Sequence, residues 1–192
     1  MSEAFWALGR STGLIALGLL TLAVVIGVVA RSGRPAVGMP RFAVQAVHRA
    51  TALTAVVFVG LHVTSLFFDP YAQLRLVDVL VPFHAARNPF WVGLGTATVD
   101  LLIAVTITGL LRTRIGPHAF HIIHVSTYVL WPMALLHAIG SGSDVAEPWF
   151  IIPVLGALAA VSAACAWRLS PKFHDRSAER RSALRSERTR TR

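Results

Sequence analysis

The chain has only one cysteine among its 192 residues, and only 14% of its residues are charged. A lone cysteine, Cys165, excludes an intramolecular disulfide and any metal site built from several cysteines, so we expect it to serve in packing. The sequence also lacks a glycine-rich dinucleotide-binding motif and a Walker motif. What dominates instead is hydrophobic residues, which make up 55% of the chain.

The hydrophobic residues gather in five long runs, at 14–30, 50–68, 90–111, 119–139 and 149–167. Each run is close to the ~20 residues that an α-helix needs to cross about 30 Å of hydrocarbon. The first run is long for a signal peptide and no convincing cleavage site follows it. We therefore predict an all-α integral membrane protein, with a bundle of five transmembrane helices in residues 1–169 and a basic cytoplasmic tail in 170–192.

The basic residues are unevenly distributed among the connecting segments. Fifteen of the 18 Lys and Arg lie after the fifth run, between the first two runs, or between the third and fourth. An excess of basic residues in short loops marks the cytoplasmic side of a membrane. We predict an N-terminus outside and a C-terminus inside, in the plasma membrane. The basic tail is interpreted as an orientation signal and a contact for anionic lipid, not as a nucleic-acid site.

Four of the eight histidines occupy matching positions in two runs. His48 and His62 begin and end the segment HRATALTAVVFVGLH, and His124 and His137 begin and end HVSTYVLWPMALLH, which is one residue shorter. These separations correspond to roughly 21 and 20 Å of helix rise. Both helices run in the same direction, so His48 can face His124 at one level and His62 can face His137 at the other. Two stacked haems with two axial imidazoles each would require this arrangement.

Two other interpretations are weighed against the haem hypothesis. Each histidine could bond to a neighbouring helix as a solitary polar residue. Alternatively, the histidines of a transporter or structural membrane protein could bind a non-haem divalent metal, although levels ~20 Å apart make a poor single-metal site.

The two histidine separations differ in helical phase. The longer separation returns to within about 40° of the starting face, whereas the shorter one ends roughly 140° away. We therefore predict that the fourth helix is rephased by a bulge at Pro132. We also expect Arg49 to pair with a propionate of the inner haem, and Gly60 and Ala134 to leave room for the macrocycle.

In these two motifs the chain resembles the ferric reductase-like transmembrane domain superfamily. This group includes the membrane halves of NADPH oxidases and the haem subunit of the methionine sulfoxide reductase system. Residues 45–168 are similar to its short actinobacterial-type members, notably in LHVTSLFFDPYAQLRLVDVLVPF and HVSTYVLWPMALLHAIGSGSD. The resemblance implies two b-type haems, with His48 and His124 as ligands of the inner iron and His62 and His137 as ligands of the outer iron.

The resemblance further implies a cytochrome b that moves electrons across the membrane to an external acceptor, with ferric iron as the acceptor that the family label suggests. The oxidases continue into FAD and NADPH domains, which this sequence does not contain. We therefore expect a separate flavoprotein or quinol as the electron donor. The alternative is a haem-bearing membrane anchor, or quinone-reactive subunit, of a partner redox enzyme.

Asp100, in the middle of the third run, is the candidate catalytic residue because a buried intramembrane carboxylate is rarely incidental. It would carry a proton to a quinone or hold a ligating histidine, and a neutral Asp bonded to a Ser or Thr fits equally well. His121, one turn before His124, is an alternative ligand of the inner haem, but a propionate or interfacial role is favoured. His84 could approach the outer haem or an acceptor, but a solvated position in the external loop is favoured. Other residues expected at the membrane interface are His118, His174, Trp91, Trp131, Trp149 and Trp167. Trp131, with Tyr128, also lies between the two histidine levels.

Overall fold

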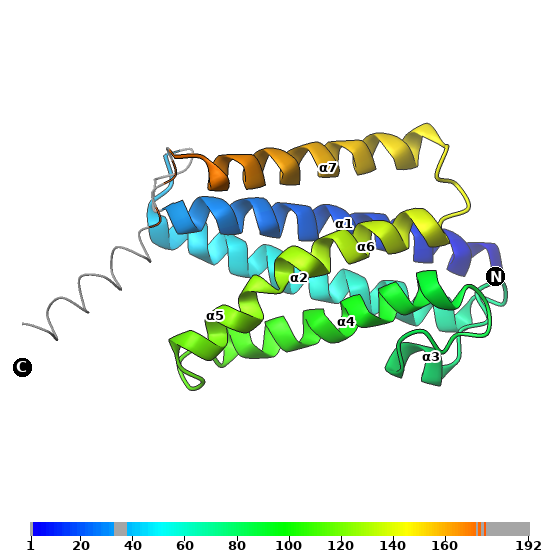
Figure 1. Cartoon of the computed structure of the whole chain (residues 1–192). Coiled ribbons are helices and arrows are strands. Elements are labelled where there is room, and N and C mark those ends of the chain that lie inside the picture. Colours follow the sequence, from blue (N-terminus) through cyan, green and yellow to red (C-terminus); the bar gives the residue numbers. More distant parts are fainter. Residues whose placement is uncertain (1, 33–37, 172, 174, 176–192) are drawn as a thin grey trace, which may run out of the picture.

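The structure, a computed structural model, describes residues 2–32, 38–171, 173 and 175, and these residues form helices without any strand. The elements are α1 (Ser2–Ser32), α2 (Arg41–Phe68), α3 (Leu76–Leu80), α4 (Pro89–Leu110), α5 (Pro117–Val125), α6 (Thr127–Ser141) and α7 (Pro148–Leu169) (Figure 1). Five segments are long and apolar enough to cross a membrane: α1, α2, α4, α5 with α6, and α7. The predicted five-helix membrane bundle is confirmed.

Proline sets several of the helix boundaries. Pro89, Pro117 and Pro148 each stand in the first turn of a helix, where a missing N–H costs nothing. At the other end, Phe68 and Leu169 are each followed by one residue and then a proline, whose ring disfavours helical backbone in the residue before it.

The helices extend beyond the predicted apolar runs. The largest differences are in α1, which begins at Ser2 and not near residue 14, and in α2, which begins at Arg41 and not near residue 50. Hydropathy finds the part of a helix that lies in hydrocarbon and misses polar turns that continue it. Most of the predicted basic tail, including His174, lies outside the described residues.

The long helices run side by side (Figure 1). The start of α1 and the short helix α3 lie at one end of the bundle, here named the α3 end, and α5 lies at the opposite end, named the α5 end. α1 packs mainly against α2 and α7, whereas α4 packs mainly against α6.

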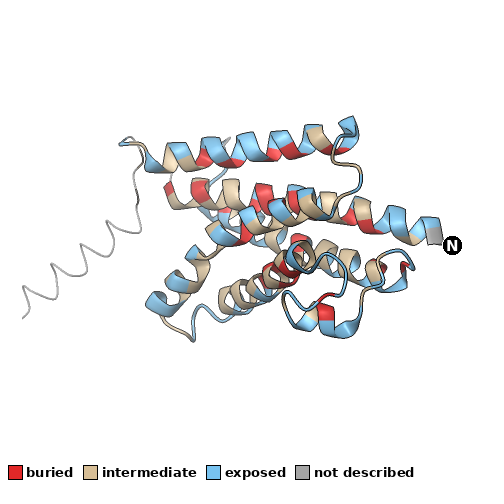
Figure 2. Ribbon diagram, turned by 45° about the vertical axis from the view of Figure 1, so that its right-hand side comes forward, coloured by how far each residue is buried: buried red, intermediate tan, exposed pale blue. Residues whose placement is uncertain are grey.

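The apolar core lies mainly where α1, α6 and α7 meet. Figure 2 shows buried residues in red on these and on other helices. Its members include Leu17, Leu20, Leu130, Trp131, Leu135, Phe150, Val154, Ala157 and Val161. Large apolar side chains also cover the outside of the bundle, among them Val57, which is 59% exposed, and Ile152, which is 66% exposed. An apolar outer surface of this extent is what a lipid-facing protein needs.

Candidate functional site

Two pairs of histidine rings face each other across the bundle, one pair near each end. His62 of α2 and His137 of α6 form the pair at the α3 end, with ring centroids 6.2 Å apart and ring planes at 78°. His48 of α2 and His124 of α5 form the pair at the α5 end, with centroids 6.1 Å apart and planes at 79°. The pairing expected from the sequence is therefore present, with nearly the same geometry at both levels.

The spacing within each pair fits a metal atom between the rings. An imidazole nitrogen lies about 2 Å from a metal that it binds. With the ring centre about 1 Å beyond the nitrogen, two imidazoles on opposite sides of one metal have centroids about 6 Å apart. Among the described residues, no group of three or more His, Cys, Asp or Glu side chains is placed to share a metal. Two protein ligands per level suit haem iron, whose other ligands come from the macrocycle, better than an ion held by protein alone.

Three of the four imidazoles are anchored by backbone carbonyls of neighbouring helices. The Nδ1–H of His62 donates to the Gly9 carbonyl at 2.7 Å, that of His48 to Ala23 at 3.0 Å, and that of His137 to Trp91 at 2.8 Å. A carbonyl can only accept, so Nδ1 must carry the proton in each ring. In the neutral ring the lone pair is then on Nε2, so each of these imidazoles can bind a metal through that nitrogen.

Glycines let these three rings approach the neighbouring helices. The ring of His62 lies against Gly13 and that of His48 against Gly27, both in α1, and the ring of His137 lies against Gly95 in α4. These glycines are not among the residues predicted from the sequence, which names only Gly60 and Ala134 as small residues, with the role of leaving room for the macrocycle. The sequence does contain a pattern that could have identified two of them, because the interval from Gly13 to Gly27 equals that from His48 to His62.

The expectation that Gly60 and Ala134 leave room for a macrocycle stays a prediction. Gly60 is exposed, with nothing within 4 Å of the place that a Cβ would occupy, and it lies two residues from His62 and so roughly 200° around the helix. Ala134 packs against the apolar core.

The fourth predicted helix is rephased at Ser126, which separates α5 from α6. The N–H of Ser126 bonds to the carbonyl of Ile123 at 3.2 Å, three residues back, which is the tight pattern of a 3₁₀ turn. Such a turn advances about 120° per residue and supplies part of the rotation that a regular α-helix lacks between His124 and His137. The predicted bulge at Pro132 is wrong, because Pro132 lies inside α6 without interrupting it.

Side-chain hydroxyls satisfy the backbone where the helix breaks. Ser126 Oγ donates to the Ile123 carbonyl at 2.5 Å, and Thr127 Oγ1 donates to the His124 carbonyl at 2.8 Å. In the hydrocarbon core of a membrane no water is available to donate hydrogen bonds to these carbonyls. A helix break is therefore tolerated where hydroxyl side chains can donate instead.

His124 is the one ring of the four whose Nδ1 has no hydrogen-bond partner in the described part of the chain, although that atom is buried. Its ring stacks on Phe120 with centroids 5.0 Å apart. His124, and not His121, is the residue that pairs with His48.

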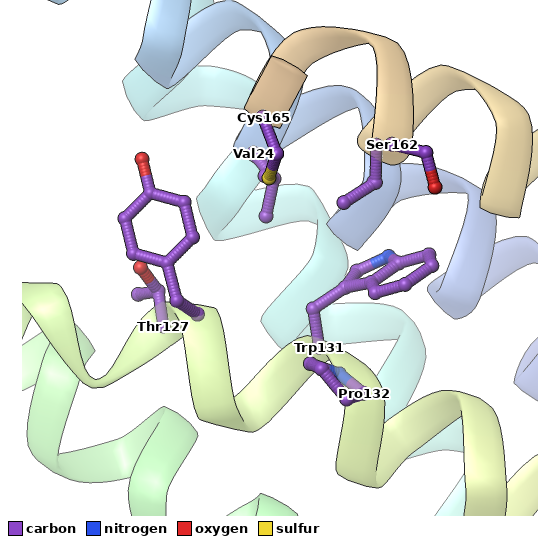
Figure 3. A pocket seen from close by; sticks show the side chains of 8 residues that line it. Val24, Thr127, Trp131, Pro132, Ser162 and Cys165 are labelled. Carbon is purple, nitrogen blue, oxygen red and sulfur yellow. The ribbon is translucent and has the colours of Figure 1, made fainter. Parts of the chain in front are cut away.

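A cavity of about 170 Å³ lies between α1, α6 and α7 and contains none of the four histidines (Figure 3). Tyr128 and Trp131 line it, and the Trp131 indole donates to Thr21 Oγ1 at 3.0 Å while the Arg168 guanidinium donates to the Tyr128 hydroxyl at 2.5 Å. Both side chains are thus engaged on the α1 and α7 side. The cavity is smaller than the about 300–1,000 Å³ of usual small-molecule sites.

Asp100 is exposed on α4, so the expectation of a buried carboxylate is wrong. It follows Gly95 by five residues and therefore points roughly 140° away from the face that holds His137. Ile103 and Ile107, one and two turns further along, are 50% and 49% exposed and continue the same outward face.

The loop that carries α3 is clamped to the start of α4. Arg75 donates to both carboxylate oxygens of Asp78, at 3.1 and 2.7 Å, and Thr96 Oγ1 of α4 donates to the Asp78 carbonyl at 2.6 Å. The hydrogen bonds from Arg75 hold the pKa of the Asp78 carboxyl below its ordinary value of 3.8. His84 lies exposed on this loop, as expected.

The fold and the histidine pairs define a class, namely membrane-spanning helical bundles with two levels of facing imidazoles. The model of the family described as "Ferric reductase like transmembrane component" matches residues 12–135, which is more than half of the chain. The chain therefore belongs to the ferric reductase-like transmembrane family. The matched residues include His48, His62 and His124 and end two residues before His137. No curated protein and no solved structure matches the chain.

Proposed function

We propose that the chain is a dihaem b-type cytochrome that moves electrons across the membrane. His48 and His124 would hold the iron of one haem, and His62 and His137 the iron of the other. The observation that carries the proposal is the metal-sized gap between the two rings of each pair, whose centroids are 6.1 Å apart in one pair and 6.2 Å apart in the other. The haems would supply reversible one-electron chemistry.

The chain's own contribution is to hold the ligands in place and to keep water away. The carbonyls of Gly9, Ala23 and Trp91 fix the tautomer and orientation of three imidazoles. The two ligands on α2 are separated by roughly 21 Å of helix rise, which divides the membrane into shorter electron-transfer steps. Arg49 is exposed beside His48 and is proposed as a partner for a propionate of the haem at the α5 end.

The α5 end is proposed as the cytoplasmic side of the plasma membrane. Its described arginines are Arg31, Arg41, Arg49, Arg112, Arg114 and Arg168. At the α3 end the described arginines are Arg87, Arg10, which is paired with Asp144, and Arg75, which is paired with Asp78. The positive-inside rule favours the α5 end as the cytoplasmic side. Electrons would then enter at the α5 end, from a separate flavoprotein or a quinol, and would leave to an external acceptor at the α3 end. Ferric iron is a proposed acceptor, as the family name suggests.

A reduced-minus-oxidised absorption spectrum of the purified chain, combined with a pyridine haemochrome assay, tests the proposal. We expect two low-spin b-type haems per chain. His62→Ala should remove one haem and His48→Ala the other, whereas His121→Ala, one turn from His124, should remove neither. Folded, haem-supplied protein without a Soret band would overturn the proposal and would favour a non-haem metal or a structural role for the histidines.

A second candidate is a haem-bearing membrane anchor, or quinone-reactive subunit, of a partner redox enzyme. The exposed Asp100 favours it, because a lone carboxylate near the centre of a lipid-facing helix is costly unless another protein covers it. Haem reduction by quinol that requires a co-purified partner, and that is lost in Asp100→Asn, would support this candidate. Reduction by quinol that is unchanged both without the partner and in Asp100→Asn would argue against it.

A further inference from the structure

A glycine follows each anchoring carbonyl by four residues in the same helix. The three pairs of carbonyl and glycine are Gly9 with Gly13, Ala23 with Gly27, and Trp91 with Gly95. In an α-helix the N–H of residue i+4 occupies one lone pair of carbonyl i, and the side chain of residue i+4 lies on the same face. A glycine at i+4 therefore leaves the second lone pair of the carbonyl open to a donor from another helix.

The histidine rings occupy the space that a side chain at these glycines would need. A Cβ on Gly95 would lie 2.6 Å from the His137 ring, and a Cβ on Gly13 would lie 2.9 Å from the His62 ring. The corresponding distance from Gly27 to the His48 ring is 3.2 Å, which is tight but less severe. An alanine at any of the three would push the ring away from its carbonyl and turn its Nε2 out of line.

We propose that Gly13, Gly27 and Gly95 are positioning residues for haem ligation. Each glycine opens the helix carbonyl one turn before it to the Nδ1–H of one ligating histidine, and so aims the Nε2 lone pair of that histidine at the iron. This inference rests on the proposed haem function and extends it to residues of α1 and α4 that do not touch the metal.

The bundle contains matched controls on the same helices. Gly18 in α1 and Gly109 in α4 have nothing within 4 Å of the place that a Cβ would occupy. Gly109 follows Gly95 at the same interval as Gly27 follows Gly13. Spacing along the helix therefore does not distinguish the control glycine Gly109 from the test glycines. A Gly→Ala change at Gly18 or Gly109 favours the helix and meets no neighbour.

The experiment compares Gly13→Ala, Gly27→Ala and Gly95→Ala with Gly18→Ala and Gly109→Ala in the full chain. The measurements are the number of haems per chain, the reduction potential of each haem, and the spin state of each haem by electron paramagnetic resonance. His62→Ala and His48→Ala identify which signal belongs to which haem. The haem at the other level serves as an internal check that the bundle is folded.

We expect Gly95→Ala and Gly13→Ala each to remove the low-spin signal of the haem between His62 and His137 and to leave the other haem intact. The low-spin haem content per chain should therefore fall twofold. Gly27→Ala should affect only the haem of His48, and less strongly. Both control variants should keep two unchanged haems. A wild-type chain with two haems, combined with unchanged spectra and potentials in all three test variants, would overturn this inference alone. Equal loss of both haems in each test variant would also overturn it, because that result indicates general packing damage. A wild-type chain without haem would overturn the proposed function as well.

Discussion

Replacing Asp100 with leucine tests whether the exposed face of α4 is separate from the histidine site. Asp100 lies roughly 16 Å along a helix whose length is roughly 33 Å, so it is near the centre of the bilayer. Placing Asp at a helix centre costs about 2.5–3.5 kcal/mol, whereas Leu there is favourable by about 0.3–0.6 kcal/mol. The substitution should therefore make insertion more favourable by roughly 3–4 kcal/mol.

Two measurements on the isolated chain check this expectation. Unfolding in lipid bicelles should require more denaturant for Asp100→Leu than for wild type, with Asp100→Asn in between and Ile103→Leu unchanged. The haem content per chain should be the same in all four proteins, because Asp100 points away from His137. A lower stability or a lost haem in Asp100→Leu would refute the reasoning and would place the carboxylate in the histidine site.

Two further predictions concern the loop at the α3 end and the break at Ser126. The pKa of the Asp78 carboxyl is lower in the folded chain than its ordinary value of 3.8. The ionised carboxylate therefore stabilises the loop above the unfolded pKa, and this stabilisation is lost as the pH falls through the lower, folded pKa. Arg75→Gln should move this loss upward towards 3.8, seen as weaker protection of the amides of residues 69–88 from hydrogen exchange than in wild type at the same acidic pH. Equal protection in the two proteins would contradict it. Ser126→Ala with Thr127→Val removes two hydroxyl donors and should lower the free energy of unfolding by about 1 kcal/mol for each bond, whereas Thr127→Ser should have little effect. Equal stability of the double variant and wild type would show that the hydroxyls are dispensable.

The membrane spans and the histidine pairs could be predicted from the sequence because both depend on simple repetition. Runs of apolar residues reveal helices in lipid, and nearly equal intervals between the histidines of two co-directional helices place two levels at matching depths. His48 with His124 and His62 with His137 are the pairs found in the structure. The sequence could not reveal the anchors of these rings in the same way, because a carbonyl is present at every residue.

The predictions for Asp100 and Pro132 are wrong because the position of each residue depends on helical phase and on the neighbouring helix, which apolar runs do not reveal. The apolar run around Asp100 predicts an interior position, yet the angle of Asp100 relative to Gly95 turns it outward. Pro132 is the expected site of rephasing because proline often disturbs helices. The break occurs at Ser126, where two consecutive hydroxyl side chains can take the released carbonyls.

The break at Ser126 also determines where this chain can change in length. In α2 an uninterrupted helix brings His48 and His62 to one face, whereas in α5 and α6 a tight turn achieves the same result with one residue fewer. One residue inserted between His48 and His62 would rotate one of them by about 100° with no irregular turn to absorb it. One residue inserted beside Ser126 could instead be accommodated by relaxing the turn into regular helix. The longer and the shorter spacing are therefore two forms of one arrangement, and alignments of such chains should place the gap at the break.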